Sequence, residues 1–276
     1  LSSANSINIG RLAPQVVYYF KAYSELCRSG RIQTGDLVDF VVPTGNFGDI
    51  LAGYLAKKAG LPVGKLICAS NANNVLTEFL NTGVYNKNRP FHLTQSPSMD
   101  ILISSNLERL LYLLCEDDKA VAGWMEELQR DGRYFIGEAL LQKLHQEGFE
   151  AFWCDDAHAA SSIRELWFDR GYLCDPHTGV AANALRQYAA LTGDKTPAVI
   201  VSTASPFKFA SAMLPAMDLD FSGDEFQQLE VMEIVSSRTA PAPLKRLKEL
   251  PVRFDRVIPR QEMRAAVVQW LEGGKA

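Results

Sequence analysis

The residues best suited to chemistry form the run Pro-Thr-Gly-Asn-Phe-Gly-Asp at positions 43–49. The run follows an apolar segment at 37–42, typical of a strand buried on both faces, and helical spacing resumes at 49–59. In open α/β sheets, ligands bind at the carboxyl ends of strands, and a helix N-terminus offers unpaired amides to a phosphate. The glycines would let the backbone approach an anion, and Asn46 could add a donor. Since the run fits neither the dinucleotide nor the Walker pattern, a phosphate site and a plain strand-to-helix turn both remain open.

A second candidate is the run Asn-Ser-Ile-Asn-Ile-Gly-Arg at 5–11, which precedes a segment with helical spacing. Arg11 could bind phosphate oxygens in a bidentate manner, and Ser6 and Asn8 could add hydrogen bonds. The alternative is a capped helix entry with a solvated arginine.

A third candidate follows a strand expected at 197–202. The hydroxyl groups of Thr203 and Ser205 would lie at the same sheet edge as the loop at 43–49, because parallel strands end at one edge. A polar strand terminus without a function is the alternative.

The histidines give weaker signals. His177 belongs to an Asp-Pro-His-Thr run before a helix, which we interpret as a rigid turn capped by Asp175 or Thr178 rather than as a catalytic site. The other histidines are isolated, and no cluster has the spacing of metal ligands, so we expect no metal.

The alternation of strand and helix signals predicts an α/β fold with a parallel sheet and right-handed crossovers. Strands are expected at 37–42, 65–69 and 197–202, whereas the stretch 83–170 has few strand signals. In that stretch, Ser105–Glu108 resembles a capping box that opens a helix. We therefore expect a phosphate-binding α/β part at 1–82, a mostly helical insertion at 83–170, and the remainder of the large α/β domain with a C-terminal helix at 171–276. The other expected helices lie at 12–29, 49–59, 73–80, 119–130, 137–147, 157–170 and 179–191.

Composition excludes several classes of protein. The 276 residues carry a net charge of −4, which does not favour a nucleic-acid or polybasic membrane surface, and no apolar run approaches the ~18 residues of a spanning helix. The five cysteines include no C-x-x-C pair, which is typical of reduced thiols in a cytoplasmic protein. We therefore expect neither a nucleic-acid nor a membrane partner.

Taken together, the motifs resemble the threonine synthase family, whose members are pyridoxal 5'-phosphate enzymes of fold type II with the three-layer tryptophan-synthase-β-like fold. The matching runs are 3–8 with Arg11, then 43–49, 175–181 and 203–209. The resemblance implies that Thr203 lies beside the pyridine nitrogen and that Ser6, Asn8 and Arg11 hold the phosphate of the substrate. It also implies that the cofactor phosphate is held by Gly45, Asn46, Phe47, Gly48 and Asp49.

The implied activity is that of a carbon–oxygen lyase of threonine biosynthesis, which converts O-phospho-L-homoserine and water to L-threonine and phosphate. The family's catalytic lysine, which forms a Schiff base with the cofactor, lies in a Phe-Lys-Asp-type motif upstream of the Asn-Ser-Ile-Asn run. That run begins here at position 5, and no lysine of the chain has the required context. We therefore expect the chain to be the C-terminal portion of such an enzyme, without the N-terminal domain and inactive alone.

Two alternatives remain. One is another fold type II lyase, although the expected phosphate-binding residues at 5–11 argue against substrates that lack a phosphate there. The other is a non-catalytic, threonine-synthase-like protein that binds phosphate ligands, which the missing lysine would favour.

Overall fold

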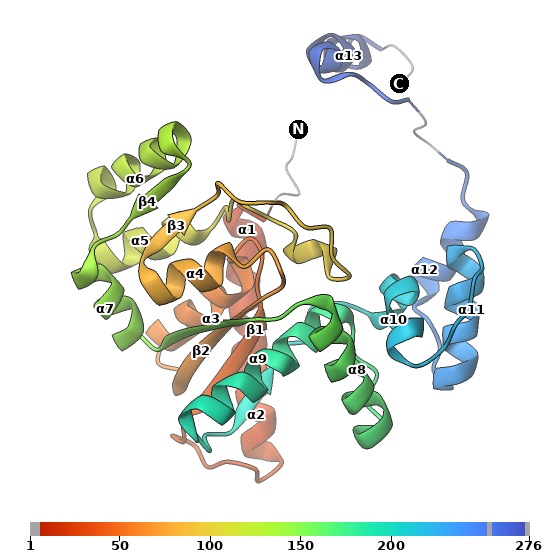
Figure 1. The fold of residues 1–276 in the computed structure, drawn as a ribbon, viewed down its shortest axis with the longest axis horizontal. Coiled ribbons are helices and arrows are strands. Elements are labelled where there is room, and N and C mark those ends of the chain that lie inside the picture. Colours follow the sequence, from red (N-terminus) through yellow and green to blue (C-terminus); the bar gives the residue numbers. More distant parts are fainter. Residues whose placement is uncertain (1–5, 253–255, 274–276) are drawn as a thin grey trace.

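The computed structural model describes residues 6–252 and 256–273. Its main sheet has four parallel strands in the order β5-β2-β1-β6 (Figure 1). These are β1 (Val38–Pro43), β2 (Val63–Ser70), β5 (Phe149–Trp153) and β6 (Ala198–Ile200). All six residues of β1 are buried, as expected for an inner strand of a parallel sheet covered on both faces.

Helices cover both faces of this sheet and make three layers. Phe40 and Val42 of β1 belong to the core shared with α2 (Val16–Arg28), α3 (Gly48–Lys58) and α4 (Val75–Thr82). Val41, which points to the opposite face because side chains alternate along a strand, packs with α9 (Pro176–Thr192), and α8 (Asp156–Arg170) lies against α9. The predicted three-layer parallel α/β fold is therefore confirmed.

A smaller group of elements lies beside the main sheet (Figure 1). An antiparallel ribbon of β3 (Val84–Asn86) and β4 (Arg133–Phe135) packs with helices whose apolar faces close the same core. These helices are α5 (Leu107–Cys115), α6 (Asp118–Asp131) and α7 (Glu138–Gln146).

The 3-10 helix η2 (Pro97–Met99) lies between β3 and α5, and the remaining elements precede α2 or follow β6. The first are α1 (Ile9–Leu12) and the short 3-10 helix η1 (Ala13–Gln15). After β6, the 3-10 helix η3 leads to helices that form a separate apolar cluster with α8. The segments after β6 are η3 (Pro206–Phe209), α10 (Ala210–Ala216), α11 (Glu225–Ser236), α12 (Ala242–Arg246), η4 (Leu247–Glu249), η5 (Arg260–Glu262) and α13 (Met263–Leu271). Within the two described ranges, no helix is long and apolar enough to cross a membrane.

Three sequence predictions need correction. The helix expected at 12–29 is divided into α1, η1 and α2, because Pro14 lacks an amide hydrogen and starts a 3-10 turn. The capping box at Ser105–Glu108 is wrong, since Asn106 is the N-cap of α5 and its side chain does not cap the helix. The stretch 83–170 is mostly helical, but its strand β5 pairs with β2 in the main sheet, and the sequence reading missed β3, β4 and β5.

The buried Asp39 makes folding sensitive to pH. Its side chain is 2% exposed, and Oδ1 accepts a hydrogen bond from the amide of Lys65 at 2.6 Å. Burial raises the pKa of Asp39 to about 6, although the bond from Lys65 acts in the opposite direction.

Asp39→Asn should therefore reduce the pH dependence of stability. Between about pH 4 and pH 6 the carboxyl ionises in the unfolded chain but not yet in the folded one. The unfolding free energy of the parent chain should thus fall relative to that of the variant, by up to about 3 kcal/mol. Urea unfolding at both pH values measures the difference, with the exposed Asp169→Asn as control. Parallel pH profiles for parent and Asp39→Asn would contradict the assignment.

Candidate functional site

The site begins where β1 ends. The amide of Thr44 continues the ladder by donating to the carbonyl of Ala69 at 2.9 Å, and the chain then turns sharply at Phe47, which has φ 61° and ψ 8°. This left-handed backbone is unfavourable for a residue with a side chain, and it is held because the Phe47 ring is buried. The ring stacks on Phe149 with 6.1 Å between centroids. Helix α3 starts at the next residue.

The loop carbonyls are hydrogen-bonded. The Ser104 hydroxyl donates to the Gly45 carbonyl at 2.9 Å, and Asn106 donates to the Asn46 carbonyl from its backbone amide at 3.1 Å and from Nδ2 at 2.8 Å. The Phe47 carbonyl accepts from the amide of Leu51 at 3.2 Å.

The loop amides differ from the carbonyls. The N–H groups of 45–50 have no acceptor among the residues that the structure describes. The positive end of the α3 dipole lies at the same place. The loop is thus a row of donors suited to an anion, which we call the amide cradle and define as the backbone N–H groups of residues 45–50.

Packing explains one of the two glycines of the motif. A Cβ on Gly45 would lie 2.7 Å from the carbonyl oxygen of Ser98, so only glycine fits beneath that segment. A Cβ on Gly48 would lie 3.6 Å from Asn106 Nδ2, an ordinary contact. Close packing therefore requires Gly45, whereas the role predicted for Gly48 rests on its amide.

The side chains of Phe47 and Asp49, both in the run at 43–49, contact other residues of the protein. The Phe47 ring lies in the core, so its contribution to the cradle is the backbone. The Tyr19 hydroxyl donates to Asp49 at Oδ1 (3.0 Å) and at the carbonyl (2.8 Å), which joins α2 to α3. Burial raises the pKa of Asp49, and the bond from Tyr19 partly opposes that shift.

The N-terminal segment is brought to the cradle by the start of α5. Asn106 Nδ2, which binds the Asn46 carbonyl, also lies 3.3 Å from the Ser6 carbonyl, and Arg109 Nη2 donates to the Ile7 carbonyl at 2.6 Å. The Ser6 hydroxyl lies 3.4 Å from that of Ser105. The sequence predictions at 5–11 and 43–49 therefore fall in neighbouring segments, although Asn5 and the residues before it lie outside the described part.

Asn8 and Arg11 have different surroundings. Asn8 is the N-cap of α1, and its Oδ1 accepts from the Gly10 amide at 2.9 Å, so the helix-entry reading holds for this side chain. Arg11 is an exposed residue in the last turn of α1.

Thr203 lies where the sequence places it, past the carboxyl end of β6. Strand β6 is parallel to β1, and the amide of Val201 donates to the Val41 carbonyl at 2.9 Å, which fixes the two strand ends side by side. Thr203 is exposed, as a residue that contacts a ligand at this edge must be.

The Asp-Pro-His-Thr run forms the capped turn that we expected. Asp175 is the N-cap of α9 and accepts from the His177 amide at 2.9 Å. His177 also reaches the site, because its Nε2 accepts from the amide of Ser98 at 3.2 Å. Ser98 is the residue that packs on Gly45.

Sequence reasoning missed the residues that hold the loop. Asn106 falls within the run Ser105–Glu108 that we interpret as the entry to a helix, and sequence reasoning gives Ser98, Ser104 and Arg109 no role. The sequence feature that could have revealed these residues is the polar run at 104–106 before an apolar helix. Its residue types, however, suit a helix cap and long-range hydrogen bonds equally.

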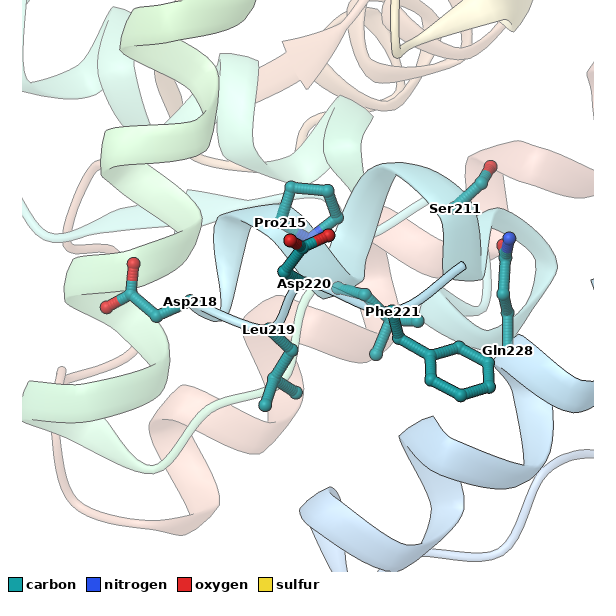
Figure 2. A pocket seen from close by; sticks show the side chains of 8 residues that line it. Ser211, Pro215, Asp218, Leu219, Asp220, Phe221 and Gln228 are labelled. Carbon is teal, nitrogen blue, oxygen red and sulfur yellow. The ribbon is translucent and has the colours of Figure 1, made fainter. Parts of the chain in front are cut away.

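A pocket of about 360 Å³ beside α10 is a different kind of feature. Figure 2 shows that the carboxylates of Asp218 and Asp220 point away from each other, and Asp218 forms an ion pair with Arg164. No group of three or more potential metal ligands occurs in the described part of the chain. The cradle is therefore the stronger candidate for a ligand site.

Comparisons with known proteins identify chains that are similar in sequence and in structure. Residues 178–268 match the family model described as "Threonine synthase, C-terminal". The chain is 46% identical over 222 residues to human threonine synthase-like 1, covering 79% of this chain and 29% of that protein. It is 36% identical over 273 residues to threonine synthase of Eremothecium gossypii, covering 92% and 49% respectively.

Two solved structures are similar over nearly the whole chain. PLP-bound threonine synthase from Brucella melitensis superposes with a TM-score of 0.79 at 35% identity, covering 98% of this chain and 53% of that one. Yeast threonine synthase gives 0.80 at 32% identity, with the same coverage. The chain spans about half the length of these threonine synthases.

Asn106→Ala should release the N-terminal segment from the amide cradle. The substitution leaves the carbonyl of the half-buried Asn46 with one donor fewer and removes the contact with the Ser6 carbonyl. We expect a loss of about 1–3 kcal/mol of unfolding free energy and faster amide hydrogen exchange over 6–12. Asn88→Ala is the matched control, since the exposed Asn88 also donates from Nδ2 to a backbone carbonyl at 2.8 Å. Equal effects of the two variants would contradict the role of Asn106.

Proposed function

Because the chain belongs to the threonine synthase family, we propose that it is the phosphate-binding part of a pyridoxal-phosphate enzyme that forms L-threonine and phosphate from O-phospho-L-homoserine and water. The observation that supports this proposal best is the amide cradle at the end of β1. The carbonyls of Gly45, Asn46 and Phe47 accept hydrogen bonds, whereas the amides of 45–50 have no acceptor within residues 6–252 and 256–273. Such a row of N–H donors suits a phosphate monoester.

The residues present fit pyridoxal phosphate on physical grounds. Gly45 has no side chain to obstruct the anion, α3 points its positive dipole end at the cradle, and burial disfavours the charged form of Asp49. In our proposal Gly45, Phe47, Gly48 and Asp49 bind the cofactor phosphate through backbone amides, and Asn46 adds its side-chain amide. When bound, the cofactor supplies a ring that withdraws electrons from the substrate carbon.

Thr203 is proposed to orient the ring. A threonine hydroxyl can donate a hydrogen bond to a pyridine nitrogen but cannot protonate it as an aspartic acid would. The ring would then remain a milder acceptor of electrons. The position of Thr203 at the carboxyl edge shared by β1 and β6 supports this role.

We propose that the substrate phosphate binds at the N-terminal segment. Arg11 supplies a guanidinium group, and the Ser6 hydroxyl and the Asn8 amide are the other candidate donors. The contacts from Asn106 and Arg109 keep this segment next to the cradle, so two phosphate groups would bind near each other. The exposed Arg11 would then balance part of their charge.

The chain is proposed to lack the lysine that carries the cofactor. Lys57 donates to the carbonyls of Glu147 (2.8 Å) and Gly64 (3.1 Å), and Lys58 pairs with Glu147. Lys208 is exposed, and its Nζ lies 5.6 Å from the centroid of the Phe209 ring. Lys57 and Lys58 are thus held in contacts with backbone or a carboxylate, and Lys208 belongs to the run 203–209. None of the three lies in a Phe-Lys-Asp-type motif.

A non-catalytic phosphate-ligand-binding protein is the second candidate. The 46% identity to human threonine synthase-like 1 favours it, as does the proposed absence of the lysine. Both candidates require the cradle to bind a phosphate ligand, and both fit a cytoplasmic protein with five free thiols.

Binding of pyridoxamine phosphate tests the cradle directly, since this ligand cannot form a Schiff base with lysine. We expect saturable binding by calorimetry, and Asn46→Asp should weaken it by at least about tenfold because a carboxylate repels the phosphate. Gln146→Glu, a charge change of the same sign at an exposed position of α7, should leave binding unchanged. Equal affinity for pyridoxamine, which lacks the phosphate, would overturn the proposal.

Reductive trapping tests the missing lysine. Treatment with pyridoxal phosphate and then borohydride, followed by peptide mapping, should give scattered modification with no lysine labelled stoichiometrically. One stoichiometric pyridoxyl-lysine would show that the chain carries a cofactor lysine after all.

A further inference from the structure

We propose that His177 is a positioning residue for the phosphate site. It holds the segment around Ser98 against Gly45 and joins this segment to the one that follows β6. The inference rests on the proposed function for its effect on ligand binding, but the contacts themselves do not depend on it. The Asp-Pro-His-Thr motif thereby gains a role beyond capping α9.

The surroundings of His177 fix its tautomer. The ring is 2% exposed, and Nδ1 lies 2.7 Å from Oδ1 of Asp175, which is fully buried. A carboxylate accepts and does not donate, so Nδ1 carries the hydrogen. Nε2 is then a lone-pair acceptor, which matches the amide of Ser98 at 3.2 Å. Each ring nitrogen is thus bonded to one partner, Nδ1 to a carboxylate oxygen and Nε2 to a backbone N–H.

The bond to Ser98 acts on the cradle through close packing. A Cβ on Gly45 would lie only 2.7 Å from the carbonyl oxygen of Ser98 and 3.3 Å from the Cα of Met99, so this segment packs directly on the Gly45 backbone. A shift of this segment would therefore move or uncover the first residue of the cradle. His177 fixes the position of the segment relative to Gly45, because its ring accepts from the Ser98 amide and is itself held by the hydrogen bond to Asp175.

The other side of the turn reaches the segment of Thr203. The ring of His177 meets that of Phe209 edge-on, with centroids 4.9 Å apart, and the Thr178 hydroxyl lies 3.2 Å from the Ser202 hydroxyl. Thr178 also donates to Asp175. One buried turn thus contacts the segment of Thr203 directly and reaches Gly45 through Ser98.

A second Asp–His pair in the chain shows that capping alone does not need this arrangement. Asp155 is the N-cap of α8, and its Oδ1 lies 2.6 Å from Nδ1 of His158. The His158 side chain is 68% exposed, and its Nε2 has no hydrogen-bond partner in the described part of the protein. His177 has the same bond to a capping aspartate, but its second nitrogen is used to hold Ser98.

Two variants separate the bonds of His177. In His177→Asn the side-chain amide can replace Nδ1 and bind Asp175, but nothing reaches Ser98. In His177→Gln the longer side chain places an oxygen near the Nε2 position, where it can accept from the Ser98 amide. His158→Asn is the matched control at the exposed pair.

We expect His177→Asn to speed hydrogen exchange of the Ser98 amide about tenfold or more, and to weaken pyridoxamine phosphate binding about 5- to 20-fold. His177→Gln should recover much of both, and His158→Asn should change neither. A purely structural cap would make Asn and Gln equally damaging or equally harmless, with no specific effect on Ser98, and that result would overturn the inference.

Wild-type measurements keep the inference testable if the variants do not fold. NMR of the labelled imidazole should show the Nδ1–H tautomer with Nε2 as acceptor, and the Ser98 amide should be protected from exchange. An Nε2–H tautomer or an unprotected Ser98 amide would refute it. If the parent chain fails to bind pyridoxamine phosphate, the proposed function fails, while the exchange and tautomer results still decide the role of His177.

Discussion

The candidate phosphate site depends on one local constraint, the left-handed backbone at Phe47. For a residue with a side chain this conformation costs about 1–2 kcal/mol, and complete burial of a phenylalanine contributes a stabilisation of similar or greater size. The stack of Phe47 on Phe149 therefore holds a turn that the backbone alone would not favour. At this turn the loop carbonyls accept hydrogen bonds from residues at the start of α5, and no acceptor for the amides of 45–50 lies in the described part of the chain. The stack of Phe47 on Phe149 in the core thus helps to fix the backbone conformation of the loop at 43–49.

Segments far apart in the sequence hold the loop at 43–49 in place, and each does so through a different contact. The first turn of α5 binds the loop carbonyls and the N-terminal segment, and Ser98 closes over Gly45. The turn at the start of α9 fixes Ser98 and touches the segment after β6. These contacts explain how two candidate phosphate sites and a candidate ring-binding residue come to one sheet edge.

The sequence predicted the sheet, most helices and the loop at 43–49, since buried strands and amphipathic helices leave strong periodic signals. It missed β5, where Glu150 and half-buried residues interrupt the apolar pattern of an edge strand. Asn106 and Ser98 could not be assigned, because their roles come from contacts with residues about 50 or more positions away. His177 was correctly placed in a capped turn, but its second bond depends on tertiary packing. Local structure could therefore be predicted from the sequence, whereas the tertiary contacts that position the loop could not.

Titration with inorganic phosphate, followed by amide NMR of the labelled chain, tests the central claim most directly. The account predicts that the largest shifts occur at the amides of 45–50 and that Asn46→Asp removes them, because these groups bind the anion through N–H donors. Largest shifts elsewhere in the chain, or an unchanged response in the variant, would show that the loop is an ordinary turn between a strand and a helix.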